Sequence, residues 1–385
     1  MHVIRVTDQS TAREFISFTS RLYHREKAWS HFQQKHAKEM LLLRDQMLLD
    51  GESQFWILSN FRGETIGRIA AFVDRSQDPH HPTGFFGLFE CINHRKAAAL
   101  LLDECQYWLK QFGVQEMHGP LHFLAFHQGW VAENKSSQHP FPLLSFQAAY
   151  YQELFDAYGF KAFSQNLLYH LDSTEDLLDN AQKKLAEQII EGDTFAIKKV
   201  DKKGFSKTSE DIAAVCAKSA DPYSPCLSAA EVMRWLRQLY HLSYDPSIWI
   251  AYHQEEAVAF SVNAIVPSKD SMEQHGKRWH QLLSRFSSKT RSIINLSTRL
   301  AVCHQDSGLL EAMLYQVNEY FSTENSPRHD AYLFLGDTFS HPDIAVKKRT
   351  EINTYYKYSY QFEQAPLIGT FAKSNADAPD ERANI

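Results

Sequence analysis

The order of strand and helix patterns along this chain repeats once, and that repeat constrains the fold more than any other feature. The first half shows three strand patterns, then a helix, a strand, a helix and a strand, at residues 54–61, 65–73, 84–92, 94–113, 114–123, 148–160 and 161–172. A similar order returns at residues 194–200, 247–266, 291–303, 308–321, 330–339 and 354–364. Such internal repetition indicates a duplicated unit. The sequence therefore predicts an α/β (α+β) protein of two tandem domains, each a mixed, largely antiparallel sheet flanked by helices.

The segments between these patterns give the expected domain limits. Residues 10–50 carry apolar residues at three- and four-residue steps and predict two helices, the first capped by Ser10 or Thr11. An amphipathic connecting helix is predicted at residues 173–191, opened by Ser173 or Thr174. We expect an N-terminal domain at 1–172, a linker helix at 173–192, a C-terminal domain at 193–365 and a flexible tail at 366–385.

Composition excludes several classes of protein. The 385 residues are 44% hydrophobic and 22% charged, as in soluble globular proteins, and no run approaches the ~18 apolar residues that a membrane span needs. The start has neither a basic nor an apolar leader region, so we expect a cytoplasmic protein. A net charge of −6 gives no general attraction to nucleic acid. The five cysteines lie far apart and suggest neither a disulfide framework nor a zinc site.

The segment around Gly308 has the pattern of a phosphate-binding loop. It runs from a predicted strand, LSTRLAV, into CHQDSGLLEAML at the start of a predicted helix. A glycine at such a junction lets backbone N–H groups turn toward a ligand, and the N-terminus of the helix adds partial positive charge. The segment resembles the acyl-CoA pyrophosphate loop of the GNAT acyltransferase superfamily, with Gln305 and Gly308 at two motif positions. Leu310 replaces the small residue usual at the last position.

The first half resembles one branch of that superfamily, the bacterial-ceramide-synthase-like proteins. The likeness covers roughly residues 55–172 and rests on GRIAA, a His-containing loop, GFFGLFE, a helix ending in Trp-Leu and Gly, a Gly-Pro pair and YYQELFDAYGF. The branch has two GNAT-like domains. The resemblance implies transfer of an acyl group from an acyl-CoA or acetyl-CoA co-substrate to a primary amine, in one member of the branch a sphingoid-type lipid amine. After the Gly-Pro pair the sequence departs from the pattern of the branch, so the resemblance does not identify the acceptor of this chain.

The resemblance gives two groups of cofactor-binding candidates. In the second half these are Val302, Gln305, Ser307, Gly308 and Leu309. In the first half, Arg95 and Lys96 open a helix whose first turn would ordinarily favour acidic residues, and their positive charge there suits a phosphate group; charges placed against this rule are more often plain surface charge.

Catalytic candidates lie on and near the GFFGLFE strand. Glu90, beside Phe89 and Cys91, is the candidate base, because an apolar setting raises a carboxyl pKa; the alternative is a carboxylate paired with Arg68 or turned to solvent. His80 and His81 could relay protons from the preceding loop, or could be ordinary exposed histidines.

Aromatic candidates complete the predicted machinery. Tyr151, with Tyr150, could donate a hydrogen bond to the departing thiolate, although an aromatic pair at the start of a short helix is more often core. Alternating Tyr356, Tyr358 and Tyr360 could supply the same acid in the second half. No metal is expected, because Pro120 breaks the helical spacing among His118, His122 and His127.

Two other readings of the repeat remain open. One is a transferase resembling the Fem aminoacyl-tRNA ligases, against which the acidic net charge argues mildly. The other is an inactive binding or sensing module that keeps the old cleft. For an enzyme, we expect a small-molecule or lipid amine as acceptor, no nucleic-acid partner, and peripheral contact with the inner membrane surface if the acceptor is a lipid, through aromatic residues between 123 and 146. The sequence leaves the oligomeric state open.

Overall fold

The computed structural model describes residues 1–24, 51–75, 78, 80–121, 131–132, 147–171, 178–200, 204–219, 228–242, 246–267, 291–304, 307–323, 330–336 and 350–362. The strands are β1 (His2–Arg5), β2 (Gly51–Ser59), β3 (Thr65–Asp74), β4 (Thr83–Cys91), β5 (Glu116–Leu121), β6 (Val131–Ala132), β7 (Lys161–Leu171), β8 (Ala196–Lys199), β9 (Ser247–His253), β10 (Glu256–Pro267), β11 (Arg291–Leu300), β12 (Asp330–Gly336) and β13 (Thr350–Gln361). The helices are α1 (Gln9–Leu22), α3 (Arg95–Lys110), α4 (Tyr151–Tyr158), α5 (Asn180–Glu191), α6 (Phe205–Lys218), α7 (Ala229–Leu242) and α9 (Leu309–Thr323), with a 3₁₀ turn, η5, at Val302–His304. The predicted mixed α/β architecture is confirmed.

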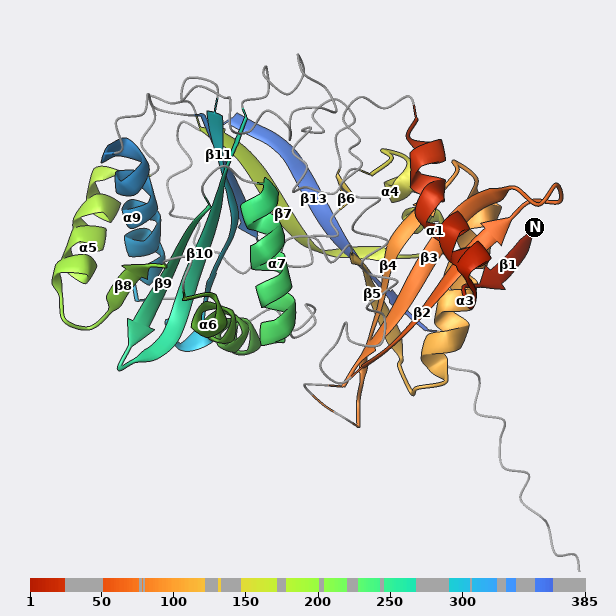
Figure 1. The fold of residues 1–385 in the computed structure, drawn as a ribbon, viewed down its shortest axis with the longest axis horizontal. Coiled ribbons are helices and arrows are strands. Elements are labelled where there is room, and N and C mark those ends of the chain that lie inside the picture. The colour runs from red at the N-terminus through yellow and green to blue at the C-terminus, as the bar shows by residue number, and fades with distance from the viewer. Residues whose placement is uncertain are drawn as a thin grey trace, which may run out of the picture.

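The described strands form one continuous sheet across both halves of the molecule. Its order is β1-β2-β3-β4-β5-β13-β7-β12-β11-β10-β9-β8, with β6 pairing β13 off this path (Figure 1). The last strand, β13, is antiparallel to both β5 and β7, and β7 is antiparallel to β12. Each half contains one parallel pair, β4 with β5 and β11 with β12. The C-terminal strand therefore completes the sheet beside the first half, and β7 borders the second.

Helices cover both faces of the first half of the sheet. On one face, Phe15 of α1 packs with Phe55 and Phe72. On the other, Leu101 and Trp108 of α3 pack with Trp56 and Ile69. Each large apolar side chain buried in this way stabilises the fold by roughly 1.5–3 kcal/mol. Both faces of β3 are thus buried, as every position from Thr65 to Asp74 shows.

The second half is layered in the same way. Helices α6 and α7 bury Ile212 and Leu236 against Ile250 and Phe260. On the opposite face, α5 and α9 pack against Ala259 and its neighbours, and the two helices lie side by side (Figure 1). The sheet is therefore the middle layer throughout.

Acidic residues open two of the helices. The N-cap of α1 is Asp8, whose carboxylate accepts from the N–H of Thr11, while the Thr11 hydroxyl accepts from the Asp8 N–H. The N-cap of α5 is Asp179, in a capping box with Gln182. The predicted caps were wrong. Ser10 and Thr11 lie inside the first turn of α1, one and two residues after its start, and α5 begins at Asn180 with Asp179 as its N-cap. Ser173 and Thr174 lie outside the described residues. The second predicted N-terminal helix and the tail lie outside the described residues.

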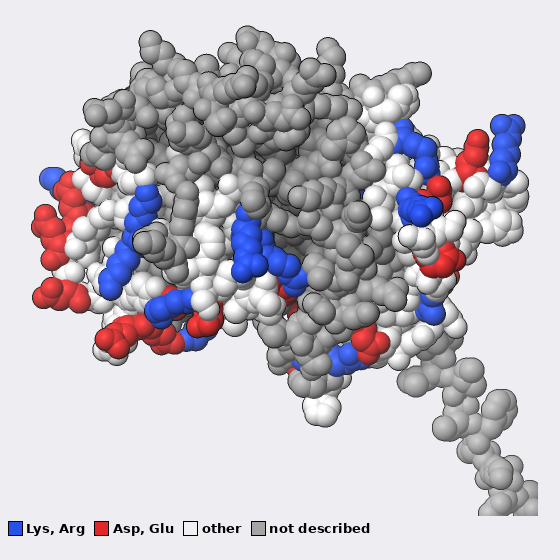
Figure 2. Space-filling model, in the orientation of Figure 1, with Lys and Arg blue, Asp and Glu red and all other residues white. Residues whose placement is uncertain are grey.

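The described surface carries mixed charge. On the face in Figure 2, Lys and Arg side chains occur near Asp and Glu side chains over both halves. Within the ranges given above, none of the helices combines the length and the apolar character needed to cross a bilayer.

Candidate active site

The first candidate site begins where β4 separates from β5. The two strands pair from Gly84 with Met117 to Gly87 with Leu121, and β5 then ends while β4 continues to Cys91. A Cβ on Gly87 would lie 2.2 Å from the Leu121 carbonyl oxygen, so this close approach requires glycine. Beyond this point, among the residues that the structure describes, β4 has a strand partner on its β3 side alone.

A β-bulge on β4 sets the direction of the side chains after the separation. Arg68 pairs with Glu90 and Ala70 with Gly87, so two residues of β4 lie opposite the single Ile69 of β3. One of them, Leu88, has a φ of 49°. A bulge of this kind re-aims the following side chains. Here it leaves Glu90 directly across from Arg68.

Glu90 lies at the centre of a buried hydrogen-bonded cluster. The Tyr23 hydroxyl donates to Glu90 Oε2 over 2.5 Å, and the Tyr151 hydroxyl donates to the same oxygen over 2.7 Å. The two phenol oxygens are 3.1 Å apart. On the other carboxylate oxygen, Oε1, the described residues place no hydrogen-bond donor; Arg68 Nη2 lies 4.0 Å away. Glu90 is 4% exposed and Tyr151 is fully buried.

Burial gives this carboxyl an unusual proton affinity. Desolvation raises the pKa of Glu90 from 4.5 to about 7, against the opposing effects of the Arg68 charge and the two tyrosine hydrogen bonds. Burial also raises the pKa values of Tyr23 and Tyr151 well above 10, and the Glu90 charge adds to this effect. The phenols therefore stay protonated as donors, while the carboxyl can exchange a proton near neutral pH.

Arg68 is held on the face of the sheet covered by α1. Its Nη1 donates to the Phe15 carbonyl oxygen over 2.7 Å, and its guanidinium lies 4.7 Å from the centre of the Phe15 ring. Its Nε, although buried, has no hydrogen-bond partner within the described part of the chain. Burial lowers the Arg68 pKa, and the Glu90 charge opposes this.

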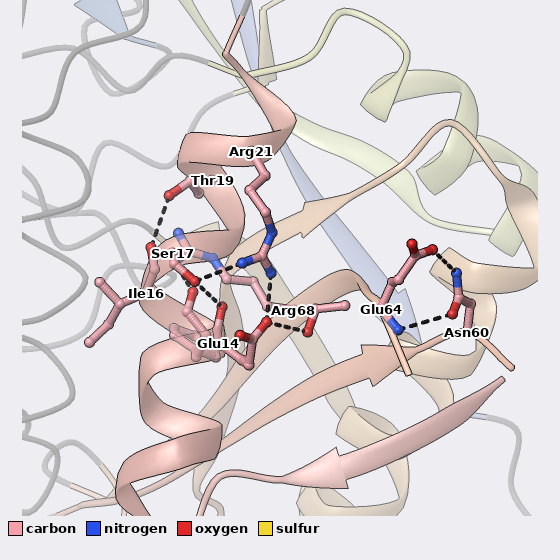
Figure 3. Close-up of polar contacts among 10 residues, drawn as sticks. Glu14, Ile16, Ser17, Thr19, Arg21, Asn60, Glu64 and Arg68 are labelled. Atoms are coloured by element: carbon pink, nitrogen blue, oxygen red, sulfur yellow. Dashed lines mark hydrogen bonds and ion pairs between the residues drawn. The ribbon is translucent and has the colours of Figure 1, made fainter. Parts of the chain in front are cut away.

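Polar contacts fix α1 on β3 and so place Tyr23, which is its C-cap. Glu14 accepts from Arg21 Nη2 over 2.7 Å and from the Thr65 hydroxyl over 2.9 Å, and Arg21 also donates to Ser17 (Figure 3). The Tyr23 N–H donates to the Thr19 carbonyl oxygen, which closes the helix. The cluster is thereby assembled from α1, β3, β4 and α4.

The paired tyrosines of α4 also satisfy the open edge of β4. The Cys91 N–H donates to the Tyr151 hydroxyl over 3.0 Å, and the Tyr150 hydroxyl donates to the Cys91 carbonyl oxygen over 2.7 Å. Unpaired backbone groups at a buried strand edge are unfavourable. In the first half, phenols rather than a strand occupy this part of the edge.

The structure separates the two predicted catalytic histidines from Glu90, whereas Tyr151 contacts it. His80 and His81 lie exposed in the turn before β4, where His81 Nδ1 is 2.9 Å from Asp78. The seven residue-to-residue steps from Thr83 to Glu90 span about 23 Å of strand. The two histidines are therefore at the opposite end of β4.

Arg95 and Lys96 are exposed at the first turn of α3, shortly after Glu90. The N-cap is His94, whose Nδ1 accepts from the Ala97 N–H over 3.2 Å. Both cations are thus free of the core and close in sequence to the end of β4.

The Gly308 loop joins β11 to α9 in the second half. Gly308 has a φ of 74°, and a Cβ there would lie 3.1 Å from the Leu185 side chain of α5. The Ser307 hydroxyl and N–H both donate to the His304 carbonyl oxygen, and Val302 is 53% exposed. Leu309, like Leu310, is a core side chain, so only its backbone remains for a ligand. Gln305 lies outside the described residues.

The second half repeats the bulge but not the chemistry. Val262 pairs with Ser297 and Asn263 with Asn295, so β11 carries one extra residue. Pairing of β11 with β12 stops at Asn295, as that of β4 with β5 stops at Gly87. The first pair beyond each bulge is Arg68 with Glu90 in one half and Val262 with Ser297 in the other.

A neutral polar network takes the opposite face of this second bulge. Asn295 Nδ2 donates to Asn263 Oδ1 over 2.8 Å and to the Thr298 hydroxyl over 3.0 Å, and the Ser261 and Thr298 hydroxyls are 3.0 Å apart. All four side chains are buried. The sequence signal that could have predicted this network is the presence of these polar residues within the otherwise apolar patterns of β10 and β11.

Sequence reasoning missed Tyr23. It is 67 residues away from Glu90 along the chain, at a helix end, and no motif connects the two. Arg68 was foreseen only as a counter-charge for Glu90. Among the described residues, no three His, Cys, Asp or Glu side chains are grouped as a metal ion would require.

Comparison with known proteins places the fold. No family model matches the chain, and no curated protein matches its sequence. A conserved protein of Enterococcus faecalis V583, described as a probable N-acyltransferase, matches with a TM-score of 0.56 and 10% identity over 94% of this chain and 72% of that chain. A GCN5-related N-acetyltransferase of Anabaena variabilis matches with a TM-score of 0.52 and 7% identity over 93% of this chain and 72% of that chain.

A third match is a GCN5-related glucosamine N-acetyltransferase region of a fungal GH3 β-N-acetylglucosaminidase. Its TM-score is 0.55 with 8% identity, over 93% of this chain and 38% of that chain. These likenesses extend over nearly the whole chain at very low identity. The chain therefore has the fold of the GCN5-related N-acetyltransferases, as the glycine loop and strand order suggested.

Proposed function

We propose that this chain is an N-acyltransferase that moves an acyl group from a CoA thioester to a primary amine, with Glu90 as the base. The observation that carries the proposal is the position and burial of Glu90. Its carboxyl lies just beyond the point where β4 separates from β5, and burial raises its pKa to about 7. The fold of the solved neighbours supports acyl transfer in general.

The described side chains suit the two proton movements of such a reaction. A CoA thioester supplies the activated acyl carbon. Glu90 accepts the proton that the amine loses as its nitrogen bonds to that carbon, and the C–S bond breaks. The Tyr150 phenol, which burial keeps protonated, is suited to donate toward the departing thiolate. The proton of Tyr151 is already donated to Glu90 Oε2. A positioned base and acid together contribute roughly 10²- to 10⁴-fold.

Arg95 and Lys96 are the proposed phosphate contacts for the reacting CoA. They follow Glu90 at the next helix start, whereas β4 and β11 are five strands apart, about 24 Å at the usual strand spacing. A CoA held by the Gly308 loop would serve the β11 edge rather than Glu90. We therefore propose two separate places for a CoA, one in each half, rather than one composite site.

A binding role is the second candidate function, and it concerns the second half. After Asn295, β11 has no strand partner on its β12 side among the described residues. Free strand edges bind extended amide-bearing chains. The neutral network beside it offers no base, so this half favours binding of a CoA arm without chemistry.

The acceptor class is proposed from likeness alone. The resemblance of the first half points to a sphingoid-type lipid amine, and one structural neighbour is described as a glucosamine N-acetyltransferase region. Thiol release should therefore be screened with acetyl-CoA and palmitoyl-CoA against sphinganine, glucosamine and a short polyamine.

Glu90→Gln tests the proposal directly. We expect turnover to fall at least tenfold, with the affinity for CoA from isothermal titration unchanged, both measured well below the Tm of each variant. Glu52→Gln is the matched control, because Glu52 is an exposed carboxylate on β2 paired with Arg75. Turnover by Glu90→Gln equal to that of the control would remove Glu90 from the mechanism. If isothermal titration gives no binding heat with acetyl-CoA or palmitoyl-CoA, the result would favour an inactive module that binds neither compound.

A further inference from the structure

The two phenols at Glu90 bind one and the same carboxylate oxygen. Tyr23 and Tyr151 both donate to Oε2, while Oε1 receives no hydrogen bond from the described residues and lies 4.0 Å from Arg68 Nη2. An ionised carboxylate has about four lone-pair sites on its two oxygens. The arrangement is therefore strongly asymmetric.

Asymmetry of this kind fixes the orientation of the carboxyl. Two hydrogen bonds on Oε2 stop rotation about the last side-chain bond, and the 3.1 Å contact between the phenols couples their positions. Tyr23 itself is 3% exposed and belongs to the end of α1, so the fixing contact reaches across from a different element. Oε1 stays open for proton exchange.

We propose that Tyr23 is a positioning residue, which together with Tyr151 locks Glu90 Oε2 and so presents Oε1 as the proton-accepting atom. This inference rests on the proposed function. It assigns to α1 a direct part in the site, through a residue that no motif in the sequence marks.

In the described part of the chain, the charged and titratable groups that interact with Glu90 belong to this assembly. They are Arg68 of β3, Tyr23 at the end of α1, Tyr150 and Tyr151 at the start of α4, and the adjacent Cys91 of β4. Arg68 and the two phenol hydrogen bonds favour the charged carboxylate. Loss of one phenol hydrogen bond should therefore make Glu90 hold its proton to higher pH.

The first test is a titration that needs no substrate. The infrared band of the protonated Glu90 carboxyl is identified by its absence in Glu90→Gln and followed against pH in Tyr23→Phe and Tyr151→Phe. We expect the pH midpoint of the Glu90 titration to rise by about one pH unit in each variant, because each loses one hydrogen bond to the charged carboxylate. Tyr158→Phe is the control, because Tyr158 is also on α4 but donates to Asp103. An unchanged midpoint in Tyr23→Phe would overturn the inference.

The second test asks whether the two phenols act as one lock. Each single variant leaves the other hydrogen bond on Oε2, so turnover should fall about threefold or less. The double variant Tyr23→Phe/Tyr151→Phe frees the carboxyl, and its loss should exceed the product of the two single losses. A double loss equal to that product would contradict a shared lock. If Glu90→Gln retains turnover while the infrared shifts occur, the proposed function fails and the positioning of Glu90 by Tyr23 stands as structure alone.

Discussion

Each half of the molecule has a β-bulge at the corresponding position. The bulge lies on β4 in the first half and on β11 in the second, near the point where that strand stops pairing with its parallel neighbour. In the first half the pair beyond the bulge is Arg68 with Glu90, joined by tyrosines from two helices. In the second half the corresponding pair is Val262 with Ser297, and uncharged side chains form a network on the other face. One backbone device thus holds an ionisable cluster in one copy and a neutral network in the other. Under the proposed function, proton transfer belongs to the first half and binding of a CoA arm to the second.

Removing the polar head of Glu90 should have the largest effect on stability. Glu90→Leu leaves the Tyr23 and Tyr151 hydroxyls buried without their shared acceptor and leaves Arg68 without a neighbouring carboxylate, and we expect a loss of about 3–5 kcal/mol in the free energy of unfolding. The double variant Arg68→Met/Glu90→Leu should recover part of that loss. Urea denaturation measures both. In the second half, Ser297→Ala at the matching position should change stability by about 0.5 kcal/mol or less; an equal loss there would break the comparison.

The ionisable half should also make stability depend on pH. Burial raises the pKa of Glu90 from 4.5 to about 7, so between these values the folded state keeps a proton that the unfolded state has released. The stability from this group is complete below the lower value and is lost as pH rises to the upper one. Tm should therefore fall over this range, and less steeply in Glu90→Gln.

Glu231 on α7 provides an internal comparison for that measurement. Burial raises its pKa to about 7 as well, although it accepts from the Ser228 N–H and hydroxyl, and its nearest charges are Arg234 and Asp74 rather than members of the Glu90 cluster. Glu231→Gln should flatten the profile independently and additively. A Tm profile for Glu90→Gln identical to that of the unaltered protein would show that Glu90 is ionised at all of these pH values.

The neutral network should respond without any pH dependence. Asn295→Ala removes donors from Ser261, Asn263 and Thr298, which are buried, and should cost about 1–3 kcal/mol. The loss measured by denaturation should be the same at pH 5 and pH 8. Asn93→Ala is the exposed control. A loss that changed with pH would mean that this network contains a titrating partner.

The smallest expected effect concerns the glycine loop. Gly308→Ala places a side chain at a φ of 74° and 3.1 Å from Leu185, whereas Gly63→Ala has a φ of 78° with open space around it. Left-handed backbone costs about 1–2 kcal/mol for either. The difference between the two Tm shifts isolates the Leu185 contact, and Leu185→Ala should abolish it. Equal shifts would show that α5 yields to the added methyl group.

Local signals in the sequence were enough for most elements and for the central residue of the site. Alternation and helical periodicity predicted β3, β4, α3 and α9, because burial of one or two faces leaves its period in the residues. Glu90 stood out as a carboxyl in an apolar strand. Asp8 and Asp179 show the limit of such reading, since several nearby residues can cap a helix and the geometry of the first turn selects one.

What the sequence by itself determined is the repeated α/β order, the glycine junction at Gly308 and the apolar setting of Glu90, all of which depend on neighbours along the chain. Tertiary structure alone decided that β13 lies beside β5, that Tyr23 reaches Glu90, and that His80 and His81 do not. These depend on residues tens to hundreds of positions apart. Their meeting is set by strand order and helix packing, for which local periodicity carries no information.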